Sequence, residues 1–344
     1  MRGLFVDNFK KLCYNIIRKI KGVVSNLKYA LKYFSTTKKM AEADEIIIKY
    51  TESAPLDHLI WFATEKCKPE QRLIIDIDVM LLIVNEEEKR NVKLFFNSDE
   101  EQNEFFLEEI SKFADVMKKH PNLAIKVSPT FGKTADHFVA QLKVFEIPFF
   151  YDVQPSCIGE VKTLLDRGVS DIYITEYLAF HITEIKRIAE DVNIRIYPNV
   201  AQAPVICDAF SPESEDIKKF FIRPEDLDKY EDYVDVIEFF GPLDKQDVLM
   251  DIYKDGYWMG ELDELIIGFR DKINCMNLMP DFGFYRLACG HRCDVGKCNY
   301  CNISKSLAAE LLEKGIYIKK EGKKRRDEYR ANEKLMYDEP AEAI

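Results

Sequence analysis

Residues 72–77 read Arg-Leu-Ile-Ile-Asp-Ile, and residues 171–175 read Asp-Ile-Tyr-Ile-Thr. Both runs are short and rich in β-branched and aromatic residues, which is typical of β-strands. They are almost continuously apolar, as expected for parallel strands that are covered on both faces by other elements. The two runs therefore indicate an α/β protein with a parallel sheet.

Similar runs recur along the chain and alternate with helical patterns. The predicted strands are residues 45–50, 72–77, 123–127, 148–152, 171–175, 194–198, 220–222 and 234–239. The predicted helices are residues 56–64, 100–119, 135–144, 158–167, 179–190, 224–230 and 245–253. Eight strands that alternate with helices predict a (β/α)8 barrel, here over residues 40–255. An open doubly wound sheet is the alternative, and residues 79–98 are predicted to form a β-hairpin inserted at the barrel rim.

A cysteine cluster follows the predicted barrel. Four of the nine cysteines, Cys289, Cys293, Cys298 and Cys301, are spaced C-x3-C-x4-C-x2-C. Four thiolates this close together are able to surround one metal centre. The compact spacing favours a [4Fe–4S] cluster, and one structural zinc ion is the alternative. The metal-binding segment is predicted over residues 256–318, followed by a charged tail over residues 319–344.

The first 39 residues differ in charge from the rest of the chain. They carry a net charge of +9, which leaves −20 for the remainder of a chain whose total is −11. Apolar residues recur among them at helical spacing, from Phe5 to Phe34. The pattern predicts a basic amphipathic helical extension that docks on a membrane surface or an anionic partner. A helix packed on the body of the protein, or an arm used in assembly with other subunits, is the alternative. Because the sequence from Met40 resembles a natural start, this extension is expected to be dispensable for an enzyme.

Several classes of protein are disfavoured. No apolar run reaches the roughly 18 residues of a membrane span, and no secretory signal is recognisable, so a reducing cytoplasmic setting is expected. Residues 127–134 resemble a phosphate-binding loop but begin with Val127 where the first glycine belongs. The first barrel loop lacks the C-x3-C-x2-C motif of radical-SAM enzymes.

Polar residues follow the predicted strands, where barrel enzymes place their reactive groups. They are Glu52, Asp76, Asp78, Lys126, Ser128, Asp152, Glu176, Asn199, Arg223 and Glu238. Among them, Glu176, Asn199, Arg223 and Glu238 are the candidate catalytic residues. Several carboxylates around one opening suit general acid–base chemistry or the binding of a polar substrate.

Residues 221–227 (Phe-Ile-Arg-Pro-Glu-Asp-Leu), 234–241 (Val-Asp-Val-Ile-Glu-Phe-Phe-Gly) and 260–265 (Gly-Glu-Leu-Asp-Glu-Leu) lead to the cysteine cluster. Together they resemble the collagenase-like peptidase family U thirty-two, over roughly residues 171–301. The resemblance implies a barrel with an iron–sulfur cluster and a redox or hydroxylase-type reaction, RNA modification or peptidase activity, on a small-molecule or RNA substrate. The alternative is a non-enzymatic binding or assembly module with a zinc site on its four cysteines and a partner-docking N-terminal helix.

Overall fold

The computed structural model describes residues 27–32, 38–50, 61, 65–90, 98–128, 133–155, 157–174, 182–201, 221–241, 245–269, 271–274, 306 and 309–315. The strands are β1 (Lys28–Lys32), β2 (Glu45–Lys49), β3 (Arg72–Ile77), β4 (Ala124–Val127), β5 (Phe149–Tyr151), β6 (Asp171–Tyr173), β7 (Asn193–Ile196) and β8 (Val236–Glu238). The α-helices are α3 (Val79–Arg90), α4 (Asp99–Lys119), α5 (Lys133–Val144), α6 (Ile158–Asp166), α8 (Ile182–Ile188), α9 (Gln246–Asp255) and α10 (Leu262–Leu265). The described residues also contain two 3-10 helices, η1 (Met40–Glu42) and η4 (Pro224–Tyr230).

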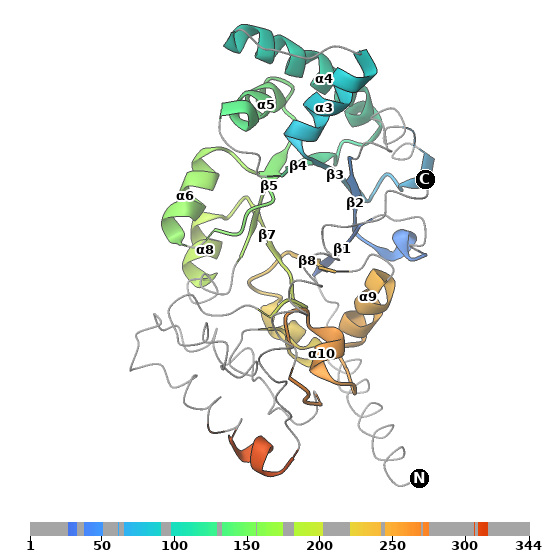
Figure 1. The fold of residues 1–344 in the computed structure, drawn as a ribbon, viewed down its shortest axis with the longest axis vertical. Coiled ribbons are helices and arrows are strands. Elements are labelled where there is room, and N and C mark those ends of the chain that lie inside the picture. The colour runs from blue at the N-terminus through green and yellow to red at the C-terminus, as the bar shows by residue number, and fades with distance from the viewer. Residues whose placement is uncertain are drawn as a thin grey trace.

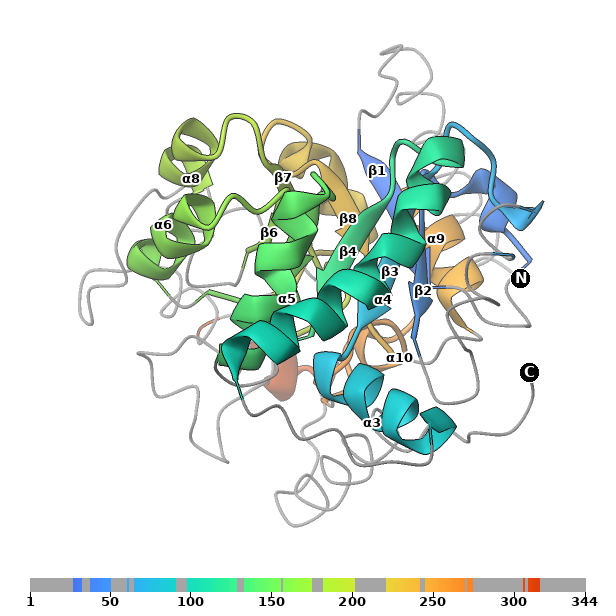
Figure 2. The same ribbon diagram turned by 90° about the horizontal axis from the view of Figure 1, so that it is seen from above.

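The eight strands form one parallel sheet in the order β5-β4-β3-β2-β1-β8-β7-β6. The edge strands β5 and β6 meet beside one another, where the amide of Ser170 donates to the carbonyl of Phe149 at 2.8 Å. The sheet is therefore a nearly closed barrel. Figure 1 shows the strands around a central axis with the helices outside them, and Figure 2 shows α4 and α5 lying across the outer face of β3 and β4. The predicted (β/α)8 fold class is confirmed.

The first strand was not predicted. β1 lies in the middle of the sheet order, with Leu31 opposite Ile46 of β2 and Ala30 opposite Glu238 of β8. Leu27 and Leu31, which contribute to the apolar helical repeat of the first 39 residues, are both buried. The predicted domain boundary at residue 40 is therefore wrong, because residues 28–32 belong to the barrel. Residues 1–26 and 33–37 of the predicted amphipathic extension lie outside the described residues.

Two other predictions are corrected. Residues 221–222 are not a strand, so β1 supplies the strand that the predicted run 220–222 was expected to provide. The hairpin predicted over residues 79–98 is instead a helix from Val79 to Arg90, and residues 91–97 lie outside the described residues. The carboxylate of Asp78 accepts the amides of Met80 at 2.9 Å and Leu81 at 3.3 Å, which satisfies donors at the start of that helix.

The core is formed mainly by the outward faces of the strands and the helices that cover them. Phe106 and Phe113 of α4 and Phe138 of α5 are fully buried, and the rings of Phe106 and Phe138 pack edge to face at 5.4 Å. The apolar layer therefore lies between strands and helices, which leaves the barrel axis to other side chains.

Within the described part of the chain, no helix is both long enough and apolar enough to cross a bilayer.

Candidate active site

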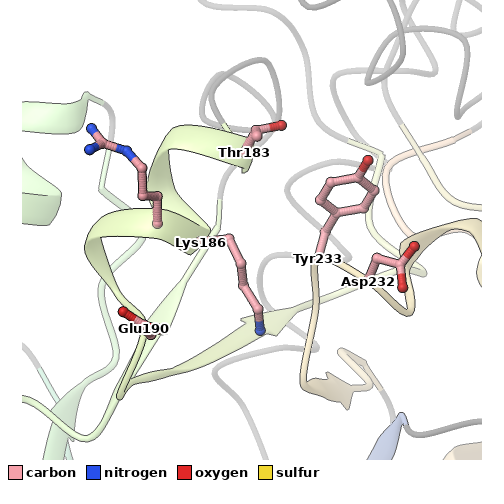
Figure 3. Close-up of a pocket in the computed structure, with 6 residues that line it drawn as sticks. Thr183, Lys186, Glu190, Asp232 and Tyr233 are labelled. Atoms are coloured by element: carbon pink, nitrogen blue, oxygen red, sulfur yellow. The ribbon is translucent and has the colours of Figure 1, made fainter.

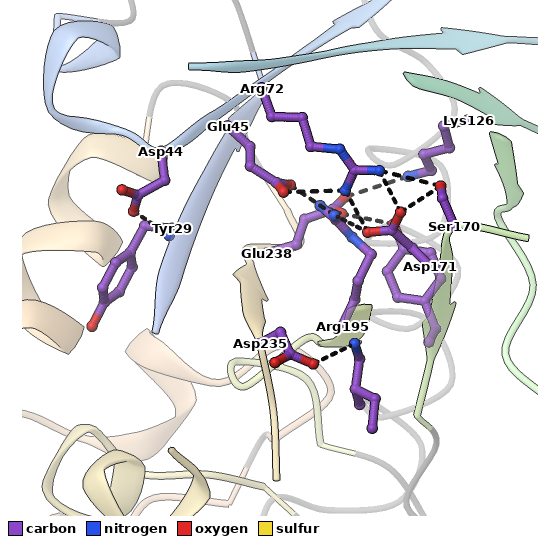
Figure 4. Close-up of polar contacts among 12 residues, drawn as sticks. Tyr29, Asp44, Glu45, Arg72, Lys126, Ser170, Asp171, Arg195, Asp235 and Glu238 are labelled. Carbon is purple, nitrogen blue, oxygen red and sulfur yellow. Dashed lines mark hydrogen bonds and ion pairs between the residues drawn. The ribbon is translucent and has the colours of Figure 1, made fainter. Parts of the chain in front are cut away.

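Charged side chains line the axis of the barrel, where branched apolar residues usually dominate. They alternate along the strands with apolar residues that face the helices, as the two-residue period of a strand requires. The set comprises Lys32 of β1, Glu45 of β2, Arg72 and Asp76 of β3, Lys126 of β4, Asp152 directly after β5, Asp171 of β6, Arg195 of β7 and Glu238 of β8. Figure 4 shows most of these side chains converging from strands far apart in the sequence.

The amino-terminal end of the barrel is closed by a network of ion pairs. Arg72 binds both carboxylate oxygens of Asp171 through its two terminal nitrogens at 2.6 Å each. Nη1 of Arg195 donates to Glu45 Oε2 at 2.7 Å and to Asp171 Oδ1 at 3.0 Å. Burial alone would raise the pKa of Asp171, but its bonds to Arg72 and the charge of Arg195 outweigh burial and lower that pKa. This end of a barrel serves stability rather than chemistry.

Lys126 is the centre of a second cluster nearer the carboxyl ends of the strands. Its side chain is 1% exposed, and its Nζ lies 3.3 Å from Glu238 Oε1, 3.3 Å from Asp152 Oδ1 and 3.7 Å from Asp76 Oδ2. Burial alone would lower the pKa of Lys126, but the surrounding carboxylates outweigh burial and raise it well above its usual value. Lys126 is therefore a fixed ammonium ion, unsuited to attack a carbonyl group as a free amine.

Glu238 joins the two clusters. Its carboxylate accepts hydrogen bonds from Tyr173 at 2.7 Å, Tyr197 at 3.1 Å and Arg195 Nη2 at 3.2 Å. Burial alone would raise the pKa of Glu238, but the charges of Lys126 and other cations, together with these hydrogen bonds, lower it well below its usual range. Glu238 therefore remains ionised and holds the surrounding groups in position.

Asp76 behaves in the opposite way. It is buried at the barrel mouth and accepts a hydrogen bond from Ser128 Oγ at 3.2 Å. Burial raises its pKa, and the opposing charge of Lys126 does not cancel that effect because Asp152 and Glu238 add negative charge nearby. A carboxyl group with a raised pKa is able to hold and release a proton closer to neutral pH. Asp76 is the best acid–base candidate among the described residues.

The position of this second cluster matches the reactive end of a barrel. Asp76 is the last residue but one of β3, and Lys126 is the last residue but one of β4. Glu238 ends β8, and Asp152 directly follows β5. The Asp152 side chain is 36% exposed, so the cluster opens to solvent on its side. We refer to Asp76, Lys126, Asp152 and Glu238 as the mouth cluster.

The structure places three of the four predicted catalytic residues. Glu238 belongs to the mouth cluster. The side chain of Asn199 is buried and bonds both backbone groups of Phe240, at 2.8 and 3.0 Å, which joins the segments after β7 and β8. Arg223 binds both oxygens of Asp226 at 2.7 and 2.9 Å at the start of η4. These contacts give Asn199 and Arg223 positioning roles, and a catalytic role for either stays a prediction.

The remaining predicted site residues, Glu176 and the four cysteines Cys289, Cys293, Cys298 and Cys301, lie outside the described residues. Among the residues that are described, no three histidine, cysteine or acidic side chains are placed to hold a metal ion. Lys126 stands between the carboxylates of the mouth cluster, in the position that a cation would take.

Several residues of the barrel interior were missed by the sequence interpretation. They are Lys32, Glu45, Arg72, Asp171, Tyr173, Arg195 and Tyr197. A signal was present, because Arg195 interrupts the apolar run of β7 and Arg72 shares one face of β3 with Asp76. A charged residue inside an apolar strand of a parallel barrel points either to the axis or into the helix layer, and the helix layer excludes unpaired charge.

A separate hollow lies away from the mouth, between α8 and the segment before β8. It is lined by Thr183, Lys186, Arg187, Glu190, Asp232 and Tyr233 (Figure 3). The ammonium group of Lys186 lies 2.9 Å from both carboxylate oxygens of Asp235, so its charge is already compensated. The hollow has mixed charge, and the mouth cluster is the stronger candidate site.

No family model matches this chain, and no curated protein matches it. Among solved structures, the chain is similar to tryptophan synthase from M. tuberculosis in its open form, with 10% identity, coverage of 78% of this chain and 94% of that chain, and a TM-score of 0.39. It is also similar to a 4-hydroxy-2-oxoglutarate aldolase/2-deydro-3-deoxyphosphogluconate aldolase, with 11% identity, coverage of 67% and 93%, and a TM-score of 0.32. Similarities this low carry no functional argument, and the barrel assignment rests on the strand order and the parallel pairing.

Proposed function

We propose that this chain is a (β/α)8-barrel enzyme that converts a polar substrate at the mouth cluster and carries a [4Fe–4S] cluster on Cys289, Cys293, Cys298 and Cys301. The observation that supports an enzyme is the mouth cluster itself. Its arrangement sets a carboxyl group of raised pKa, Asp76, beside a permanently charged ammonium group at the end where barrels place their chemistry.

The division of labour in the mouth cluster follows from its electrostatics. Asp76 exchanges a proton with the substrate, because burial raises the pKa of its carboxyl group. Lys126 stabilises negative charge that develops on a substrate oxygen, since its own charge is fixed. Asp152 is the most exposed of the three partners of Lys126, so the substrate enters over its side chain. Glu238 holds Lys126 in place.

The cysteine segment supplies the second part of the proposal. Four thiolates at C-x3-C-x4-C-x2-C spacing form a donor set of the kind that binds a [4Fe–4S] cluster, which supplies one-electron transfer when bound. The resemblance of residues 171–301 to the collagenase-like peptidase family U thirty-two supports a redox or hydroxylase-type reaction, or modification of RNA. Acid–base groups at the mouth suit either reaction, because both require proton transfer to or from a substrate oxygen or nitrogen.

Metal and sulfide analysis of protein purified without oxygen tests the cofactor. We expect about four irons and four sulfides per chain together with a broad visible absorption band. Cys298→Ser should bleach that band, whereas Cys157→Ser, which changes an exposed cysteine after β5, should leave it unchanged. One zinc per chain and no colour would contradict the iron–sulfur assignment and would favour the binding or assembly module.

Ligand screening by thermal shift tests the mouth. A compound that binds there should raise the melting temperature of the wild type, and Asp152→Asn should weaken the shift because Asp152 borders the opening. Asp166→Asn, which changes an exposed aspartate at the end of α6, is the matched control. An equal shift in all three proteins would place the binding site elsewhere.

A further inference from the structure

We infer that the barrel mouth between β3 and β5 binds a protonated amino group of a small-molecule substrate through the carboxylates of Asp76 and Asp152. The inference rests on the proposed function, since it takes the mouth cluster as the substrate site, and it adds the chemical class of the substrate. It concerns the side of the mouth where the residues that directly follow both strands, Asp78 and Asp152, are described.

The charges inside the barrel are unequal at the mouth. At the amino-terminal end, two arginines are matched by two carboxylates, Arg72 and Arg195 by Glu45 and Asp171. At the mouth, three carboxylates face two ammonium groups, Asp76, Asp152 and Glu238 against Lys32 and Lys126. One negative charge is therefore in excess, and a charge shielded from water is unfavourable without a partner. This excess fits a ligand that carries one positive charge.

The excess negative charge lies on the open side of the mouth cluster. Glu238 is fully buried and accepts hydrogen bonds from Lys126, Arg195 and two tyrosines, so the charge of Lys126 is largely compensated there. Asp152 contacts Lys126 through Oδ1 at 3.3 Å, and its side chain is 36% exposed. In the described part of the chain, no donor bonds the second oxygen of Asp152. That carboxylate is therefore accessible to a ligand and has an oxygen left to accept a hydrogen bond.

Asp76 supplies a second observation. Its side chain is only 10% exposed, and its Oδ1 accepts the bond from Ser128 Oγ at 3.2 Å. Its Oδ2 lies 3.7 Å from Lys126 Nζ, which is beyond hydrogen-bond length, and no other described residue donates to that oxygen. Buried polar atoms in folded proteins are nearly always hydrogen-bonded, so this oxygen marks a place for a donor from a ligand or a bound water.

The two carboxylates share one location and one chemistry. Asp76 Oδ2 and Asp152 Oδ1 both lie against the ammonium group of Lys126, so the two side chains border the same part of the mouth. Both offer acceptor oxygens with negative charge. A primary ammonium group suits them, because it carries one positive charge and three N–H donors and forms strong hydrogen bonds with carboxylates.

When no amine is bound, a proton on Asp76 removes the same excess of negative charge. The charged groups that face Asp76 are the cations Lys126 and Lys32 and the anions Asp152 and Glu238. Burial raises the pKa of Asp76, and the two anions add to that effect. A bound ammonium group favours the ionised form of Asp76, so amine binding should release a proton and should weaken as pH falls through the pKa of Asp76. The ionised carboxylate is then ready to accept a proton from the substrate.

Titration calorimetry with propylammonium chloride and with its neutral counterpart 1-propanol, at constant ionic strength, tests the charge preference. The wild type should bind the ammonium compound more tightly than the alcohol. Asp152→Asn should weaken binding of propylammonium by about 10-fold or more, because a hydrogen bond between charged groups is lost. Asp166→Asn, which changes an exposed aspartate at the end of α6, should leave the affinity unchanged.

The same titration in phosphate and in MOPS, two buffers that differ in ionisation enthalpy, measures the protons released on binding. In mildly acidic buffer the wild type should release a proton as propylammonium binds, and Asp76→Asn should release none. Circular dichroism of each variant separates a binding defect from misfolding. The comparison of the two variants at Asp152 and Asp166 answers the question even if the Asp76 variant does not fold.

The inference is overturned if the wild type binds propylammonium no more tightly than 1-propanol, if it releases no proton, or if the Asp152 and Asp166 variants bind the amine equally. Iron content and the thermal-shift screen on the same preparations separate the two proposals. Amine binding without iron removes the iron–sulfur assignment alone. A ligand whose thermal shift depends on Asp152, without any binding of the amine, keeps the mouth as the substrate site and removes this inference alone.

Discussion

Removing residues 1–39 should unfold the barrel, which reverses the expectation from the sequence that an enzyme would lose little. The deletion removes β1 from between β2 and β8. With it go the buried side chains of Leu27, Tyr29 and Leu31. It also leaves the facing edges of β2 and β8 with unpaired backbone groups inside what was a continuous sheet.

The magnitude follows from the burial of β1. A large apolar side chain contributes about 1.5–3 kcal/mol when it is fully buried, so the three large residues of this segment contribute roughly 5–9 kcal/mol. The free energy of unfolding of a typical native domain is only about 5–15 kcal/mol. The unpaired strand edges add to the loss, so the shortened chain should have little or no stable folded state.

Urea unfolding followed by circular dichroism, on the full chain and on two shortened chains, measures the effect. The chain that starts at Met40 should show no cooperative transition. The chain that starts at Leu27 retains every described strand and should unfold at a urea concentration close to that of the full chain. A cooperative transition of similar midpoint in the chain that starts at Met40 would refute the assignment of residues 28–32 to the barrel.

Three further predictions concern single side chains. Lys126→Met leaves Glu238 buried without its nearest ammonium group. Urea unfolding should show a free energy of unfolding that is lower by about 3–5 kcal/mol. An unchanged free energy of unfolding would contradict the buried pairing. The pKa of Asp171 is lower in the folded state than in the unfolded state. Its carboxylate therefore contributes stability that is present above the unfolded-state pKa of about 3.9 and is lost as pH falls through the folded-state pKa. Asp171→Asn should therefore flatten the acid limb of a stability–pH profile, and an unchanged slope would count against the network. Burial raises the pKa of the Cys67 thiol to about 11, so iodoacetamide should label exposed Cys157 and spare Cys67 in the native protein near pH 8, as checked by mass spectrometry.

Local patterns predicted most of the barrel. The helix predicted over residues 100–119 is α4, and the strand predicted over residues 72–77 is β3 with the same bounds. Ser98 caps α4 through a bond from the amide of Glu101 to its hydroxyl oxygen, which is the kind of signal that sequence carries directly. These elements were predictable because their periodicity is long or their apolar run is bounded by polar residues.

Two errors share one cause. The run Lys-Tyr-Ala-Leu-Lys of β1 falls within a longer apolar repeat of helical period, and the apolar run after Asp78 was assigned to a hairpin although it forms α3. Short apolar runs have too few residues for periodicity to distinguish a strand from a helix. In β1 the decision is made by pairing with β2 and β8, which no local pattern encodes.

The sequence by itself determined the parallel α/β architecture and the presence of charged residues within apolar strands. It did not determine which of those charges meet, since Lys126 and Glu238 are 112 residues apart and Arg72 and Asp171 are 99 apart. Only closure of the barrel brings the ends of distant strands to one axis, where burial makes each charge require a partner. The raised pKa of Asp76 and the ionised state of Glu238 follow from that enclosure, so they belong to the tertiary structure alone.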